Sequence, residues 1–192
     1  SLASLVEVQV PTSGDQQVNV RVTNRGQYGP DKWYALQVAE VAGDVWESDD
    51  RQAKPIALGE VQSRTFYPEG DIDRVTFAVK AGYAYEVATS GLAVGVDTAL
   101  AVMVSGRTYS NDDRSESDHS SRVRFQALVD GEATAVVSNK GQFGTAMTYA
   151  LELQQVGGDA YEPDDYSPGS LSLQERQART FFPRGDIDRV QF

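Results

Sequence analysis

The chain has 192 residues, no cysteine and a formal net charge of −11. This acidic balance excludes nucleic acid as a partner, because phosphate groups need a basic face, and it argues against binding to an anionic membrane surface. Without cysteine the chain has neither disulfides nor thiolate metal sites. No apolar run approaches the ~20 residues of a membrane span, so we expect no membrane insertion.

Apolar residues alternate with polar ones along most of the chain, which predicts strands with one buried and one solvated face. In chain order the predicted strands lie around residues 6–10, 18–22, 34–38, 75–79, 83–87, 100–104, 123–125, 135–137 and 149–153. Clusters of Gly, Asn, Asp and Ser separate the runs, as turns do. The pattern predicts an all-β fold, an antiparallel jelly-roll-like β-sandwich.

The sequence also repeats itself at a constant shift of 115 residues. Gly-Asp-Ile-Asp-Arg-Val at residues 70–75 returns at 185–190, and Arg-Thr-Phe at 64–66 returns at 179–181. A constant shift without gaps predicts tandem copies of one domain-sized unit. We therefore expect the chain to start and stop inside copies.

Two acidic stretches mark the predicted boundaries between copies: residues 43–50, the first acidic link, and residues 158–165, the second acidic link. Residues 1–43 are predicted to be the C-terminal part of a preceding copy. Residues 44–157 form one complete copy, and residues 158–192 open the next. The repeat sets the period but not the phase, so a permuted frame stays open.

Five motifs stand along the complete copy and the links. They are Glu-Pro-Asp-Asp at 162–165, Gly-Asp-Ile-Asp at 70–73 followed by Phe77, Ala-Gly-Tyr at 81–83, Asp-Thr-Ala-Leu at 97–100, and Asn-Asp-Asp at 111–113, with a closing Tyr-Ala-Leu strand at 149–151. Together they resemble the bacterial pre-peptidase C-terminal domain family, which is related to clostridial collagen-binding domains. The resemblance implies a jelly-roll-like β-sandwich, an extracellular or cell-surface location, frequent calcium binding and no catalysis.

Calcium is the cofactor that the acidic links favour, because it takes roughly six to eight hard oxygen ligands, several of them carboxylates. The candidate ligands in the complete copy are Glu47, Asp49, Asp50, Asp71 and Asp73. Their equivalents are Glu162, Asp164, Asp165, Asp186 and Asp188. The resemblance implies that the link and the later acidic pair act together. The alternative, a solvated link with turn-forming aspartates, stays open.

A second acidic loop, Asn111, Asp112 and Asp113, is a further candidate cation site, although a solvated loop is the favoured interpretation. The single histidine, His119, lies in the same polar stretch, and we expect no catalytic triad there, because triads are assembled from separated elements. Aromatic residues in strands usually belong to the core or to cross-strand pairs. The less favoured interpretation is that these aromatic residues line a ligand-binding face. The residues considered are Trp33, Trp46, Tyr28, Tyr34, Tyr67, Tyr83, Tyr85, Tyr109 and Phe143.

These observations predict a non-catalytic, calcium-stiffened repeat module of a secreted or cell-surface bacterial protein, a structural spacer or assembly unit. Its expected partners are neighbouring repeats of the same protein. An extracellular polymer is a further expectation, built by pairing of residues 158–192 of one chain with residues 1–43 of another. The alternative is an accessory module that targets a neighbouring enzyme or adhesin to collagen or polysaccharide.

Overall fold

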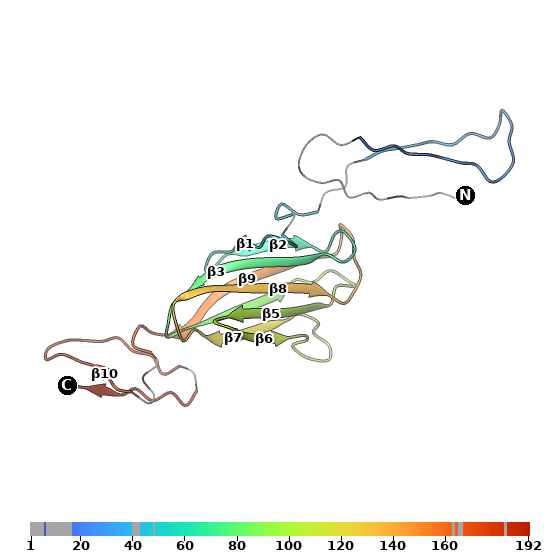
Figure 1. The fold of residues 1–192 in the computed structure, drawn as a ribbon. Coiled ribbons are helices and arrows are strands. Elements are labelled where there is room, and N and C mark those ends of the chain that lie inside the picture. Colours follow the sequence, from blue (N-terminus) through green and yellow to red (C-terminus); the bar gives the residue numbers. More distant parts are fainter. Residues whose placement is uncertain are drawn as a thin grey trace. The chain divides into compact units, whose positions relative to one another are not determined.

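The computed structural model describes residues 6, 17–39, 43–47, 49–162, 164, 167–182 and 184–192. It divides into two compact units, Ser1–Val41 (unit 1) and Ala42–Phe192 (unit 2). Within the described residues every strand lies in unit 2, and no helix forms that could cross a membrane (Figure 1). The predicted strand at 6–10 falls mostly outside these residues.

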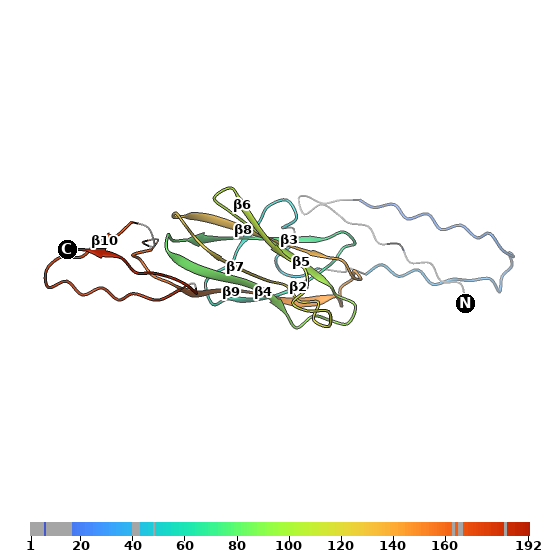
Figure 2. The same cartoon turned by 90° about the horizontal axis from the view of Figure 1, so that it is seen from below.

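Most strands of unit 2 form two facing sheets, and β10 and β11 form a separate two-stranded sheet, so the predicted all-β, sandwich-like class is confirmed (Figure 2). The strands are β1 (Lys54–Pro55), β2 (Val61–Thr65), β3 (Ile72–Val79), β4 (Tyr83–Ser90), β5 (Thr98–Val104), β6 (Arg107–Asn111), β7 (Arg122–Gln126), β8 (Gly131–Asn139), β9 (Thr148–Gly158), β10 (Gly169–Ser170) and β11 (Val190–Gln191).

One sheet has the strand order β1-β3-β8-β5-β6 and the other β2-β9-β4-β7. Pairing within both sheets is antiparallel except for the short β1, which runs parallel to β3. The predicted alternation is confirmed in β3, where Val75, Phe77 and Val79 are buried and the residues between them are not. Side chains from the inner faces of both sheets form one core between the two layers. Its largest fully buried apolar members are Tyr85, Tyr149, Phe66, Leu100, Leu151 and Leu153.

Unit 1 differs from the sequence expectation. Val20 and Leu36 lie in runs that predict a buried face, yet both side chains are exposed, whereas Ala135 and Leu151 at the same places 115 residues later are buried. In unit 2 the strand that holds Ala135 pairs with β3 and the strand that holds Leu151 pairs with β2, and the two sheets bury their inner faces against each other in one core. Alternation marks the face that a strand can bury, and burial itself requires a partner.

The end of unit 2 reproduces local contacts of its beginning. β10 pairs with β11 in parallel, with Gly169 opposite Val190, as β1 pairs with β3, with Lys54 opposite Val75. Both pairs of positions are related by the shift of 115 residues. Positions 115 residues apart therefore form the same local pairing, although the paired residues differ (Lys-Pro in β1, Gly-Ser in β10).

Candidate metal centre

The first acidic link is attached to the sandwich by its aspartates. One carboxylate oxygen of Asp44 accepts a hydrogen bond from the backbone N–H of Trp46 (2.8 Å), and the other accepts from the N–H of Thr65 in β2 (2.7 Å). Such a side chain bends the link into a turn and holds it against the sheet edge. The later acidic residues of the link are thereby brought over the start of β3.

Three carboxylates converge where the link meets the loop before β3. Glu47, Asp49 and Asp71 each offer one oxygen, and these oxygens lie within 4.8 Å of one another. Asp49 and Asp71 are almost completely buried. One side-chain oxygen of each of the three has no hydrogen-bond partner: Glu47 Oε1, Asp49 Oδ1 and Asp71 Oδ1. A buried polar atom without a partner is uncommon and calls for an explanation such as an ion or water.

The remaining oxygens of the two buried aspartates hold them in place. Asp49 Oδ2 accepts from the backbone N–H of Arg74 (3.0 Å) and from the Arg64 side chain. Asp71 Oδ2 accepts from the backbone N–H of Tyr67 (2.9 Å). Each aspartate is therefore fixed through one oxygen and leaves the other free to bind a ligand.

The charges of the cluster oppose one another. Burial, strengthened by the charges of Asp73 and Glu47, raises the pKa of Asp71 to about 8. Burial, together with the charge of Asp44, raises the pKa of Glu47 to about 7. Burial also raises the pKa of Asp49, although Arg64 opposes that shift. Carboxylates with such values at neutral pH need either a proton or a cation.

The arginine beside this cluster was not singled out from the sequence. Arg64 is fully buried in β2 and donates to Asp49, to Asp73 (2.8 Å) and to the side-chain oxygen of Gln62 (2.7 Å). A feature of the sequence that could have indicated this arginine is the recurrence of Gln-x-Arg-Thr-Phe at 62–66 and 177–181. In a strand the first, third and fifth of these positions share one face.

Two of the predicted ligands have other partners. Asp73 accepts from Arg64 through Oδ1 and from the Tyr149 hydroxyl through Oδ2 (2.6 Å), so both its oxygens serve the buried ion pair. Asp50 Oδ1 accepts from the backbone N–H of Ile72 (3.0 Å). The structure thus brings Glu47, Asp49 and Asp71 together and gives Asp50 and Asp73 supporting positions.

The second acidic link has the same arrangement. Glu162, Asp164 and Asp186 offer oxygens within 4.8 Å of one another, and a second grouping joins Asp159, Glu162 and Asp188. Glu162 Oε1 and Asp164 Oδ1 are buried and lack hydrogen-bond partners. Burial and the charge of Asp186 raise the pKa of Glu162 to about 7. Asp165 lies outside the described residues.

The hydrogen bonds around this second cluster also recur. Arg179 donates to Asp164 and Asp188, as Arg64 does to Asp49 and Asp73. Other bonds with equivalents in the first cluster join the N–H of Thr180 to Asp159 (2.6 Å), the N–H of Phe182 to Asp186 (2.7 Å) and the N–H of Arg189 to Asp164 (3.2 Å). Each partner lies 115 residues after its counterpart.

The second cluster lies directly against the end of the sandwich. Gly82, in the turn between β3 and β4, has no room for a side chain, since an added Cβ would lie 2.2 Å from the carbonyl oxygen of Asp159 and 2.8 Å from Glu162 Cβ. Gly158 likewise faces the carbonyl oxygen of Gly82 at 2.0 Å from an added Cβ. Backbone therefore touches backbone at this junction.

The predicted second acidic loop has its side chains engaged differently. Lys140 pairs with Asp112 at the surface, and the Asn111 side chain accepts from the N–H of Arg122 (2.8 Å). Asp113 joins His119 through a 3.1 Å contact that, together with the charge of Asp113, raises the histidine pKa.

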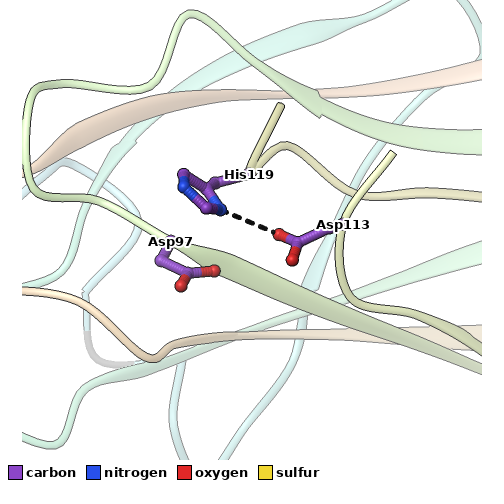
Figure 3. A group of neighbouring side chains, drawn as sticks. All are labelled: Asp97, Asp113 and His119. Carbon is purple, nitrogen blue, oxygen red and sulfur yellow. Dashed lines mark hydrogen bonds and ion pairs between the residues drawn. The ribbon is translucent and has the colours of Figure 1, made fainter. Parts of the chain in front are cut away.

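Figure 3 shows Asp113 and His119 converging with Asp97. Oxygens of the two aspartates and a ring nitrogen of His119 lie within 4.8 Å of one another. Asp97 Oδ1 is buried without a partner, but the other two side chains are exposed and already paired. We assign no metal to this group, because exposed and mutually paired polar groups need none.

The aromatic residues considered for a ligand face are divided among different surroundings. Tyr85 lies in the core and stacks on Phe125, with ring centroids 5.7 Å apart, and Tyr109 stacks on the same ring at 5.6 Å. Trp46 lies under the Arg64 guanidinium, 5.5 Å from its ring centre. Trp33 and Tyr34 are exposed in unit 1. Binding of collagen or polysaccharide stays a prediction.

No protein-family model and no curated protein matches the chain. Solved structures that are similar at low identity include the following two. The pre-peptidase C-terminal domain of a collagenase from Bacillus anthracis is 14% identical with a TM-score of 0.42, and the match covers 54% of this chain and 95% of that one. The periplasmic g-type lysozyme inhibitor PliG from Aeromonas hydrophila is 16% identical with a TM-score of 0.37, covering 53% and 94%. Both TM-scores are low, so neither likeness supports a functional argument.

Proposed function

We propose that the chain is part of a non-catalytic, calcium-stiffened repeat protein, with jelly-roll-like modules that act as structural spacers or assembly units outside the cell. The single observation that carries the proposal is the convergence of Glu47, Asp49 and Asp71, each with a buried oxygen that lacks a hydrogen-bond partner. The same convergence recurs at Glu162, Asp164 and Asp186, where Glu162 and Asp164 have such an oxygen. Hard carboxylate oxygens are the ligands that calcium prefers.

The donor set fits calcium better than softer metals. All three side chains supply oxygen, and neither histidine nor cysteine takes part, which disfavours zinc and copper. Magnesium demands a near-ideal octahedron and keeps most of its water, whereas here three carboxylates from two separate segments converge on one place. Water and backbone oxygens are left to complete the roughly six to eight positions that calcium takes.

Stiffening follows from where the ligands sit. Glu47 and Asp49 belong to the link, and Asp71 belongs to the loop before β3. An ion bound by all three fastens the link to the sandwich in addition to the hydrogen bonds of Asp44, Asp49 and Asp50. In tandem copies joined by such links, the bound ion would limit the change in relative orientation between one module and the next.

Calorimetric titration of the full chain with calcium tests the metal part of the proposal. We expect one site for each acidic link in the unchanged protein, one site in Asp71→Asn or in Asp186→Asn, and none in the double variant. Glu132→Gln, an exposed change of equal charge on β8, is the matched control and should bind like the unchanged protein. Equal heats from the unchanged protein and the double variant would leave both links as solvated acidic segments.

The stiffening part is tested by limited proteolysis with and without chelator. Calcium is expected to protect residues 43–50 and 158–165 from cleavage, because cleavage requires local opening of the backbone. The Glu132→Gln variant should show the same protection, and Asp71→Asn should lose it only in the first link. Protection that is independent of calcium would contradict the role of the ion.

A further inference from the structure

Two segments of the chain carry large apolar side chains on the surface. One is residues 17–39 of unit 1, the N-terminal segment, and the other is residues 169–192 of unit 2, the C-terminal segment. In the first, Val18, Val20, Val22, Tyr34, Leu36 and Val38 are exposed, and in the second, Leu173, Phe181, Val190 and Phe192. In the N-terminal segment they recur at every second residue of two runs, and exposed apolar side chains gathered in this way usually mark an interaction site.

The residues at matching positions of the sandwich show what such side chains bury themselves against. Tyr34 is 66% exposed, whereas Tyr149, 115 residues later, is 2% exposed. Phe181 is 81% exposed, whereas Phe66, 115 residues earlier, is fully buried. In the sandwich those two buried rings stack on each other with centroids 4.6 Å apart.

The strands that hold these residues are direct neighbours in the sandwich. β3 pairs with β8 from Ile72↔Ser138 to Val79↔Gly131, and β2 pairs with β9 from Val61↔Glu152 to Thr65↔Thr148. The C-terminal segment corresponds to β1, β2 and β3, and the N-terminal segment corresponds to β8 and the first part of β9. Each segment therefore presents the face that the other is shaped to cover.

We propose that the N-terminal segment of one copy of this chain docks on the C-terminal segment of a second copy. The proposal rests on the repeat interpretation in the proposed function, and it is independent of calcium. Transferring the observed register by 115 residues places Asn19 opposite Gln191, Val20 opposite Val190, and Tyr34 opposite Arg179.

The same transfer completes a polar network. In the sandwich Asp73 accepts from both Arg64 and the hydroxyl of Tyr149. Asp188 accepts from Arg179 in the C-terminal segment, and the matching hydroxyl is that of Tyr34, which belongs to the N-terminal segment. Docking would supply this donor from the second copy.

The composite is a contiguous part of the sandwich. In the sheet order β1-β3-β8-β5-β6 the two segments supply the first three positions, and in the order β2-β9-β4-β7 they supply the first two. The pair of segments has no counterparts of β4, β5, β6 and β7, which are the last two strands in the order of each sheet. Because every copy carries both surfaces, association runs head to tail and produces chains of copies or closed rings.

Cysteine cross-linking of the full chain tests the register, since the protein has no cysteine of its own. Asn19→Cys with Gln191→Cys places two thiols at directly opposed, outward-facing positions. Thr23→Cys with Gln191→Cys is the matched control, because its two positions are four residues out of register, roughly 13 Å along the strand. A disulfide spans only about 4–7 Å between Cα atoms.

We expect oxidation to link the first pair into dimers and longer species and to leave the control pair almost unlinked, in calcium and in chelator alike. Equal linking of both pairs would overturn the register. A disulfide formed within single chains would overturn the second copy as the occupant. Loss of linking in chelator would overturn the claim that docking is independent of calcium. If instead the calcium titration shows no binding while the cysteines still link, only the calcium part of the proposed function is wrong.

Sedimentation velocity supplies a test that needs no disulfide. Val20→Asp is expected to abolish concentration-dependent association, because it puts a charge in the buried face, whereas Asn19→Asp adds the same charge on the outer face and should leave association intact. An unchanged protein that stays monomeric at every concentration, or that associates equally well with Val20→Asp, overturns the proposal.

Discussion

Asp71→Asn separates a metal ligand from an ordinary hydrogen-bond acceptor. Asparagine keeps the size of the side chain and an oxygen that can accept the N–H of Tyr67, and it removes one negative charge from the cluster. The substitution is therefore expected to act in opposite directions: it stabilises the metal-free protein and removes stabilisation by calcium.

The magnitude follows from the shifted pKa. Burial and neighbouring charges raise the pKa of Asp71 from 3.8 to about 8, and each pKa unit corresponds to about 1.36 kcal/mol. Above pH 8 the ionised side chain therefore lowers the stability of the metal-free fold by up to about 6 kcal/mol. This is an upper bound, because Glu47 contributes to the same repulsion. Calcium at about 100 times its dissociation constant returns about 2.7 kcal/mol.

Thermal unfolding of the full chain near pH 8 measures both effects, with Glu132→Gln as the control. In chelator Asp71→Asn should unfold at a higher temperature than the unchanged protein. In calcium the unchanged protein should gain roughly 10 °C or more in midpoint, while the variant keeps only the response of the second link. A variant that is equally destabilised in both solutions would refute the reasoning, because Asp71 would then be only a partner of Tyr67.

Three further outcomes are expected. In chelator, the free energy of unfolding should be greatest near pH 4 and fall as the pH rises through the folded-state pKa values of about 7 for Glu47 and about 8 for Asp71, because a raised carboxyl pKa means that the fold favours the protonated side chain. Calcium should flatten this pH dependence. A free energy of unfolding that rises with pH in chelator would contradict the prediction. Arg64→Met should cost about 3–5 kcal/mol in urea unfolding, because it leaves buried aspartates without their partner, whereas Arg124→Met, at an exposed pair, should cost about 0–1 kcal/mol. Tyr149→Phe should lower the free energy of unfolding by about 1–3 kcal/mol through loss of the bond to the buried Asp73; an unchanged value would show that the bond contributes nothing.

Much of the sandwich could be predicted from alternation alone. The runs that became β3, β5, β8 and β9 bury the expected residues, because a strand with one apolar side can satisfy that side in only one way. Unit 1 shows the limit of the method: Val20 obeys the same pattern and is exposed. Period-2 patterning indicates which face is apolar and cannot tell whether a covering strand is within reach.

The location of the candidate site could be predicted from the sequence, but only some of the residues that form it. The repetition of the acidic residues located both clusters. The sequence could not show that both oxygens of Asp73 accept hydrogen bonds from Arg64 and Tyr149. This arrangement depends on an arginine that is buried within a strand, whereas arginine usually lies at the surface. The alternation of Asp71 with Asp73 puts both on one side of the strand, and the hydrogen bonds then give them different roles.

The contact between Gly82 and Gly158 has a mechanical consequence. Two stretches of backbone meet there with no side chain between them, so the direction in which the chain leaves the sandwich is limited by close contact of backbone atoms rather than by side chains that can rearrange. Long side chains at such a junction could rearrange and allow many angles, whereas a contact between backbone atoms allows little change of angle. A single methyl group added at either glycine would press on backbone atoms of the opposite stretch and tilt the segment that follows, without adding volume to the hydrophobic core of the sandwich.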